Sequence, residues 1–351
     1  MSAQDPFQVM NETKESRSAL DAQLSKFKPC SEVADQQPKP TSEIVALDVD
    51  ALLSTEFPPM ETMLTPWLCK QHLSMVHAWR GVGKTHFSLG VAYAVAGGGE
   101  FLKWKAEKPS HVVYIDGEMA GAAIQSRLNE IVRSTPDEHE PPEGFLKIIT
   151  PDIQNTPLPS FALVEGQALL APCIADADLI VVDNLSCLMR GGQENDGQSW
   201  EPVAEWALNL RRLGKSVLFV HHDGKGGQQR GTSRKEDIMD VVIQLEHIKD
   251  HQAEDGAAFL VKFEKARHLV GEETKTIEVA LIQDDQNKQV WTYKDAELGM
   301  SERILTLHEE VPEMSQTDIA NELGCNRSTV SRAFKKANLI DGIRRNTNGQ
   351  A

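Results

Sequence analysis

The sequence has few cysteines, and none of them stands in a spacing that makes a structural framework. The five are Cys30, Cys69, Cys173, Cys187 and Cys325, an odd number with no C-x-x-C pair. Secreted disulfide scaffolds usually have an even number of closely spaced cysteines, and structural zinc sites usually have such pairs. We therefore expect neither a disulfide framework nor a structural zinc site, and we expect a reducing, cytoplasmic setting.

Long apolar runs are also missing. No stretch approaches the roughly 20 apolar residues that a membrane-spanning helix needs. The opening residues, MSAQDPFQVM, lack the basic and then apolar pattern of a secretion signal. We expect no membrane partner.

Positive charge is in deficit, because 36 Lys and Arg stand against 52 Asp and Glu, for a net charge of −16. This balance argues against a protein that wraps polyanions with its whole surface. Residues 323–351 depart from it, with six basic side chains and one acidic. Nucleic-acid contacts are therefore expected only at this end and in the basic loop 225–235.

The chain divides into three regions by composition. Residues 1–43 are polar, rich in Lys, Gln, Ser and Pro, and bury too little apolar surface to order themselves. We interpret them as a flexible N-terminal arm, with a short helix formed against a neighbouring subunit as the alternative. Residues 44–297 form the expected core, and residues 300–345 a separate small helical module.

The core alternates apolar runs with helical patterns. The runs are continuous rather than alternating, which is typical of strands buried on both faces of a parallel sheet. They lie at 73–78, 111–116, 178–184 and 215–222, and the helical patterns at 85–97, 121–134 and 200–214. We predict an α/β fold with a parallel sheet between helices. Four later runs are expected to extend it as antiparallel edge strands, at 237–248, 257–268, 276–283 and 289–294.

A glycine-rich turn between the first strand and helix reads AWRGVGKTH. Strand before and helix after are the context of a P-loop, whose backbone N–H groups hold phosphates. Lys84 is expected to reach the β and γ phosphates of ATP, and Thr85 to bind Mg²⁺. Ala78 replaces the first glycine of the motif, which is tolerable if its φ stays negative. The predicted nucleotide-binding residues are Ala78, Trp79, Arg80, Gly81, Val82, Gly83, Lys84, Thr85 and His86.

Acidic residues end the next two strands. The apolar run LIVVD ends in Asp183, and a carboxylate at this position is typical of a Mg²⁺ ligand. Glu118 follows VVYID, at the carboxyl edge where open α/β sheets bind ligands. A carboxylate there can orient and deprotonate an attacking water. Asp116 is the competing candidate.

The fourth strand ends in His221 and His222, either of which is a candidate sensor of the γ phosphate, or simply a polar strand end. A basic loop, DGKGGQQRGTSRK, follows. Its candidates for DNA contact, or for a finger that reaches a neighbour's nucleotide, are Lys225, Arg230, Arg234 and Lys235.

Taken in order, GVGKT, VVYIDGEM, LIVVDN, FVHHDGKG and QQRGTS resemble the RecA-like ATPases. Over about residues 55–265 the chain looks closest to the RepA type of plasmid hexameric replicative helicase, a relative of the DnaB family. The resemblance implies that Glu118 is the catalytic base, that His222 senses the γ phosphate, and that Arg230 acts across a subunit interface. It also implies a ring, expected to be a hexamer, with single-stranded DNA in its channel.

The segment QTDIANELGCNRSTVSRAF resembles a helix-turn-helix. Ala320, Gly324 and Val330 occupy its small, turn and core positions. Duplex DNA would meet the second helix through Asn326, Arg327, Ser328, Thr329 and Arg332. The alternative is a three-helix module for protein contact.

The leading hypothesis is an ATP-driven DNA helicase of a plasmid, phage or mobile element. The alternative is a DNA-binding initiator or regulator in which ATP controls assembly without unwinding. A recombinase is a third class, but we identify no strand-exchange loops.

Overall fold

The computed structural model describes residues 44–57, 59–189, 197–223, 234–248, 257–286, 288–296 and 300–337. They fall into two compact units that divide between Lys294 and Asp295. The predicted arm, 1–43, and the predicted site residues Lys225 and Arg230 lie outside the described residues.

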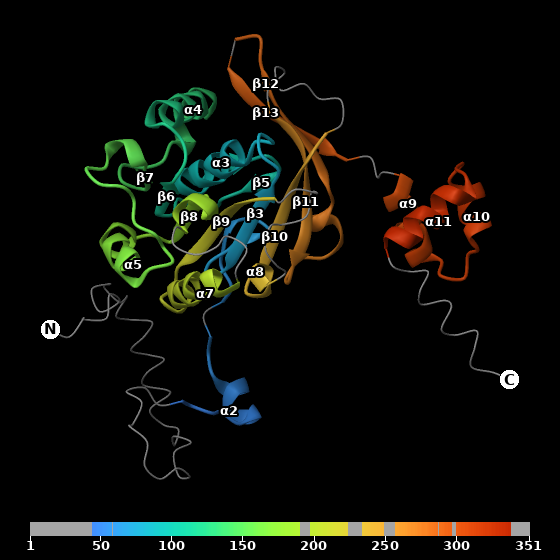
Figure 1. Ribbon diagram of the computed structural model, residues 1–351, viewed down its shortest axis with the longest axis horizontal. Helices are drawn as coiled ribbons and strands as arrows, with labels where there is room; N and C mark the ends of the chain where they lie inside the picture. Colours follow the sequence, from blue (N-terminus) through green and yellow to red (C-terminus); the bar gives the residue numbers. More distant parts are fainter. Residues whose placement is uncertain are drawn as a thin grey trace. The chain divides into compact units, whose positions relative to one another are not determined.

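A nine-stranded sheet organises the first unit, in the order β13-β12-β11-β10-β3-β9-β8-β6-β7 (Figure 1). Every pairing from β7 across to β10 is parallel, whereas β11 pairs antiparallel with both β10 and β12. The strands are β3 (Leu73–Ala78), β6 (Val112–Asp116), β7 (Leu146–Ile149), β8 (Leu179–Asp183), β9 (Ser216–His222), β10 (Val241–His247), β11 (Ala258–Ala266), β12 (Ile277–Gln283) and β13 (Gln289–Asp295).

Helices and two small hairpins surround this sheet. The helices are α2 (Val49–Ser54), α3 (Lys84–Gly97), α4 (Gly121–Ser134), α5 (Val164–Leu170), α6 (Leu185–Leu188), α7 (Gly197–Arg212) and α8 (Arg234–Asp237), with short 3-10 turns at Asp137–His139, Pro151–Ile153, Ala171–Ile174 and Gly271–Thr274. The hairpins pair β1 (Thr62–Leu64) with β2 (Leu68–Cys69), and β4 (Glu100–Phe101) with β5 (Trp104–Lys105). Within the described part of the chain, no helix has the length and apolarity to cross a bilayer.

Each face of the sheet has its own apolar core, because successive strand residues point to opposite sides. In β6, Val112 and Tyr114 belong to the core under α3 and α4. Val113 and Ile115 belong to the core that α5 and α7 cover. Figure 1 shows α3 and α4 on one side of the sheet and α7 on the other. Both faces of the parallel strands are thus buried, which explains their continuous apolar sequence.

The predicted α/β fold with a parallel sheet between helices is confirmed, with one correction. The run 237–248 was expected to be an antiparallel edge strand, but β10 pairs in parallel with β3 and lies inside the sheet. Its first residue, Asp237, ends α8 instead. The strand β7 and both small hairpins were not predicted.

The second unit consists of α9 (Met300–Glu310), α10 (Gln316–Glu322) and α11 (Arg327–Lys336). Ile304, Ile319, Val330 and Phe334 form its buried core. The Ser315 hydroxyl caps α10 by accepting a 3.2 Å hydrogen bond from the Asp318 N–H. Three helices around one small core are typical of an independently folded module.

Candidate active site

The turn from β3 to α3 requires glycine at two positions. Gly81 has φ 81° and Gly83 has φ 123°, which L side chains rarely adopt. A Cβ on Gly83 would also lie 2.9 Å from Cε1 of Phe259, whereas one on Gly81 would meet nothing within 4 Å. Ala78 is a strand residue without a positive φ. The alanine at the first position of the motif is therefore compatible with the loop.

Lys84 is the first residue of α3 and folds back over this turn. Its Nζ donates 2.8 Å hydrogen bonds to the carbonyl oxygens of Ala78 and Trp79. Only 5% of the residue is exposed. Burial lowers the pKa of Lys84 to about 8, while the charges of nearby carboxylates, chiefly Asp183, oppose this shift. An arriving phosphate would favour the charged ammonium.

The carboxylate of Asp183 lies within hydrogen-bonding reach of the Thr85 hydroxyl, at the start of α3. Its Oδ2 accepts a 2.6 Å hydrogen bond from the Tyr114 hydroxyl. Burial raises the pKa of Asp183, against the opposing hydrogen bonds from Tyr114 and the Thr85 hydroxyl. A carboxylate and a hydroxyl oxygen side by side are hard ligands of the kind that Mg²⁺ prefers. Thr85 and Asp183 therefore fit a Mg²⁺ site.

Three side chains from the carboxyl ends of neighbouring strands form a hydrogen-bonded group. The amide of Asn184 donates to Glu118 Oε2. Its Nδ2 also lies 3.0 Å from Nε2 of His222. That histidine nitrogen is 3.3 Å from the same Glu118 oxygen. Glu118 and His222, two of the predicted catalytic residues, are thus brought together, and Asn184, which sequence reasoning missed, connects them.

Asp116, the competing base, has a different task. It is 1% exposed, and its carboxylate accepts hydrogen bonds from the backbone N–H groups of Glu118 and Met119 at 3.1–3.4 Å. Burial raises the pKa of Asp116 to about 6. Because this carboxylate holds the turn after β6, the Glu118 side chain, which is 54% exposed, is better placed to meet a water.

A cavity of about 430 Å³ is lined by Lys84, Asp183, Glu118 and His222, among others. His86 also lines this cavity. Burial and, to a smaller extent, the charge of Arg127 lower the pKa of His86 to about 4. Ala78, Trp79 and Arg80, which were also predicted to bind the nucleotide, do not line the cavity. The lining is Gly81, Val82, Gly83, Lys84, Thr85, His86, Asp116, Glu118, Met119, Arg127, Asp183, His222, His247, Ala257, Ala258, Leu281 and Gln289.

The two histidines that end β9 have different surroundings. His222 reaches the Glu118 group, whereas His221 is buried, with Nε2 3.3 Å from Nζ of Lys235. Lys235 is itself only 6% exposed. The prediction that Lys235 contacts DNA is therefore wrong, because its ammonium is packed against other protein atoms and is not available at the surface. Arg234 begins α8.

A second group of charged side chains is centred on the buried His77. Nδ1 of His77, in β3, lies 2.7 Å from Asp223, and Nε2 lies 2.8 Å from Glu264. Burial lowers the pKa of His77, but hydrogen bonds and charge from the two carboxylates outweigh it and raise the pKa to about 9. This group fixes Asp223, the residue that follows the predicted sensor His222. Sequence reasoning missed it because its three members are far apart in the chain.

In the second unit, α11 has one buried and one exposed side. Val330, Ala333 and Phe334 are buried. Gly324 turns the chain before α11 with φ 62°. The predicted DNA-contact residues Asn326, Arg327, Ser328 and Arg332 are exposed, and Thr329 is half-buried.

Comparison with known proteins gives a family match and distant structural likenesses. Residues 38–228 match a family described as "AAA domain". The flagellar accessory protein FlaH from Methanocaldococcus jannaschii is 13% identical, with a TM-score of 0.44 over 64% of this chain and 90% of FlaH. The KaiC-like protein PH0186 from Pyrococcus horikoshii OT3 is 16% identical, with a TM-score of 0.43 over 64% of this chain and 90% of PH0186. No curated protein matches the chain.

Proposed function

The chain belongs to the AAA domain family and has a RecA-like P-loop ATPase core, and on this premise we propose that it is a DNA motor of the RepA helicase type. Such a motor couples Mg-ATP hydrolysis to movement along single-stranded DNA. The observation that carries the proposal is the convergence of three side chains on one cavity: Lys84 from the start of α3, Glu118 from the turn after β6, and His222 from the end of β9.

Each side chain has a distinct task in hydrolysis. Lys84 and the N–H groups of the loop hold the phosphates, and Glu118 orients the attacking water and accepts its proton. Thr85 and Asp183 would hold Mg²⁺, which would neutralise charge at the phosphates.

Coupling to movement is assigned to His222. Its Nε2 contacts Glu118, and the next residue, Asp223, is bonded to His77 in β3. If loss of the γ phosphate moves His222, the movement would therefore be transmitted through Asp223 and His77 to β3.

The motor proposal includes a ring of subunits, a hexamer, with single-stranded DNA in its channel. Arg230 would complete a neighbour's site, and Lys225 and Arg234 would contact the DNA backbone. The Arg230→Ala variant should form rings of normal mass but fail to hydrolyse ATP. Normal turnover by this variant would remove that role, and a monomer under every nucleotide condition in native mass measurements would contradict the ring.

The second unit is proposed to bind duplex DNA as a helix-turn-helix. Its support is the exposed, basic side of α11, which includes Arg327 and Arg332. This same feature favours the second candidate function, an ATP-controlled DNA-binding initiator or regulator that does not unwind.

One experiment separates the two candidates. DNA-stimulated ATP hydrolysis and strand separation on a forked duplex are measured with the full chain and with Lys84→Ala and Glu118→Gln. A motor separates strands, and both variants abolish separation. If the protein hydrolyses ATP and binds a specific duplex through residues 315–345 but never separates strands, the regulator is correct.

A further inference from the structure

A second cluster of reactive side chains lies at the opposite end of β3 from the P-loop. Cys69 ends β2, His72 directly precedes β3, and His268 follows β11. The Sγ of Cys69 is 3.4 Å from Nε2 of His268. The two imidazole rings meet edge to face, with centroids 4.8 Å apart. One ligand atom from each of the three side chains lies within 4.8 Å of the others.

We propose that Cys69, His72 and His268 bind a divalent transition-metal ion, with Zn²⁺ the best fit. One thiolate and two imidazoles form a common zinc donor set. Bonds of about 2.0–2.3 Å in a tetrahedron place ligand atoms roughly 3.3–3.8 Å apart. The observed Sγ–Nε2 distance is within that range, and the His72 ring needs only a small approach to join it.

An unpartnered nitrogen atom supports a ligand at this place. Nδ1 of His72 is buried and has no hydrogen-bond partner within the described residues. A buried polar atom without a partner costs free energy. Coordination through Nδ1 of His72 would remove this cost at that atom. His268 would bind through Nε2, and the thiol of Cys69, which is fully buried, supplies the third ligand.

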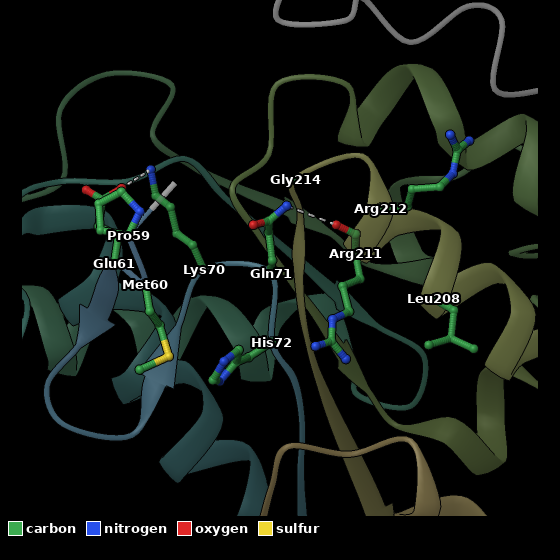
Figure 2. Close-up of a pocket in the computed structure, with 10 residues that line it drawn as sticks. All are labelled: Pro59, Met60, Glu61, Lys70, Gln71, His72, Leu208, Arg211, Arg212 and Gly214. Carbon is green, nitrogen blue, oxygen red and sulfur yellow. Dashed lines mark hydrogen bonds and ion pairs between the residues drawn. The ribbon is translucent and has the colours of Figure 1, made fainter. Parts of the chain in front are cut away.

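The fourth coordination position has a source of water. His72 lines a cavity of about 560 Å³, together with Glu61, Lys70, Gln71 and Arg211 (Figure 2). Cys69 and His268 do not line this cavity. An ion held by the three side chains would therefore face solvent only on the His72 side, with three protein ligands and one open position.

The charges around the cluster do not exclude a cation. The Arg211 guanidinium, which lines the cavity beside His72, is paired with the Asp240 carboxylate at 3.5 Å. Asp240 is also 3.5 Å from the Arg267 guanidinium. The thiolate of Cys69 would itself place one negative charge next to the bound cation. Bound metal would tie β2, β3 and β11 together at the edge of the sheet remote from the nucleotide cavity.

The earlier expectation of no structural zinc site rested on paired cysteines, which this cluster does not use. Cys69 and His72 stand in a C-x-x-H spacing, but the third ligand comes 199 residues after Cys69. His268 lies near the start of β3 because β11 runs antiparallel to β10, and the start of β10 pairs with the start of β3.

The test is cobalt and zinc binding to the untagged, metal-stripped full chain. We expect one Co²⁺ per chain, with a thiolate-to-cobalt charge-transfer band and a tetrahedral d–d spectrum, and displacement by one equivalent of Zn²⁺. Cys69→Ala should lose the charge-transfer band. His268→Gln should weaken binding by about tenfold or more, since even the loss of an outer-shell partner costs that much. Cys173→Ser, which removes an exposed thiol elsewhere, should bind as the unaltered chain does.

Absence of stoichiometric cobalt uptake would overturn the proposal, as would an unchanged charge-transfer band in Cys69→Ala. Circular dichroism checks that each variant folds. If Cys69→Ala does not fold, His268→Gln decides, because its half-buried side chain is tolerant of replacement, and an unchanged cobalt affinity in it overturns the site. None of these readouts depends on ATP hydrolysis.

Discussion

The hydroxyl of Tyr114 in β6 donates a 2.6 Å hydrogen bond to Oδ2 of Asp183, at the end of the neighbouring strand β8. Both side chains are buried. Asp183 is the proposed Mg²⁺ ligand, so the tyrosine fixes the orientation of the carboxylate that would meet the ion. Orientation of this kind is what outer-shell hydrogen bonds contribute to metal sites.

Replacing this tyrosine tests the arrangement. Tyr114→Phe should raise the Mg²⁺ concentration needed for half-maximal ATP hydrolysis by about tenfold, since outer-shell losses cost 10- to 100-fold. The matched control is Tyr93→Phe, whose buried hydroxyl has no hydrogen-bond partner within the described residues. Equal Mg²⁺ requirements in the two variants would show that Tyr114 does not position the carboxylate.

The two P-loop glycines should differ in their tolerance of alanine. Gly81→Ala meets no atom within 4 Å and should cost only the backbone strain of a positive φ, about 1–2 kcal/mol. Gly83→Ala adds a 2.9 Å approach to Phe259 and should displace the loop from β11. We expect a much larger loss of nucleotide affinity for Gly83→Ala, measured by titration with a fluorescent ATP analogue. The reverse order would contradict the loop geometry.

Removing the proposed base should separate binding from hydrolysis. Glu118→Gln keeps the shape and hydrogen bonding of the side chain but cannot accept a proton. We expect nucleotide affinity close to that of the unaltered chain and a fall in kcat of about 10²- to 10⁴-fold. Glu143→Gln, an exposed control, should change neither. If kcat survives in Glu118→Gln but not in Asp116→Asn, then Asp116 is the base.

The buried His77 should make stability depend on pH. Its pKa of about 9 in the folded chain lies above the value of about 6.5 for an unfolded histidine. The folded state therefore binds the proton more tightly, so the stabilisation is complete below about pH 6.5 and is lost as pH rises through 9. The loss is of the order of 3 kcal/mol in the free energy of unfolding.

Urea unfolding of the full chain and of His77→Gln at several pH values measures this effect. The advantage of the unaltered chain should shrink between pH 6.5 and 9, because other titrating groups contribute alike to both proteins. His139→Gln, at a half-buried position of the same unit, should show no such trend. A difference that stays constant with pH would mean that His77 is not charged in the folded state.

Much of the site was predictable because local sequence determines it. The strand before GVGKT, the helix after it, Asp183 at the end of β8 and Glu118 just after β6 are all encoded within a few residues. The structure places these side chains in one cavity because parallel strands present their carboxyl ends at a common edge.

What could not be predicted depends on distant pairings. The strand β7 is short, and none of its residues is fully buried, so its apolar signal is weak. The cavity wall of Ala257, Leu281 and Gln289 comes from strands or turns whose partners lie far along the chain. Asn184 had a local signal, because it follows Asp183 directly, but a polar residue after a strand has many ordinary uses.

The central place of β3 also has a consequence for how the chain reaches its native state. β3 is the first strand of the nine-stranded sheet in chain order, yet its partners β9 and β10 begin at Ser216 and Val241. Pairings between distant segments are slow to form, and apolar strands that wait for partners are prone to aggregate. The P-loop strand therefore has neither native neighbour until the chain has been synthesised past Ser216, and a chain truncated before residue 241 would lack one of the two.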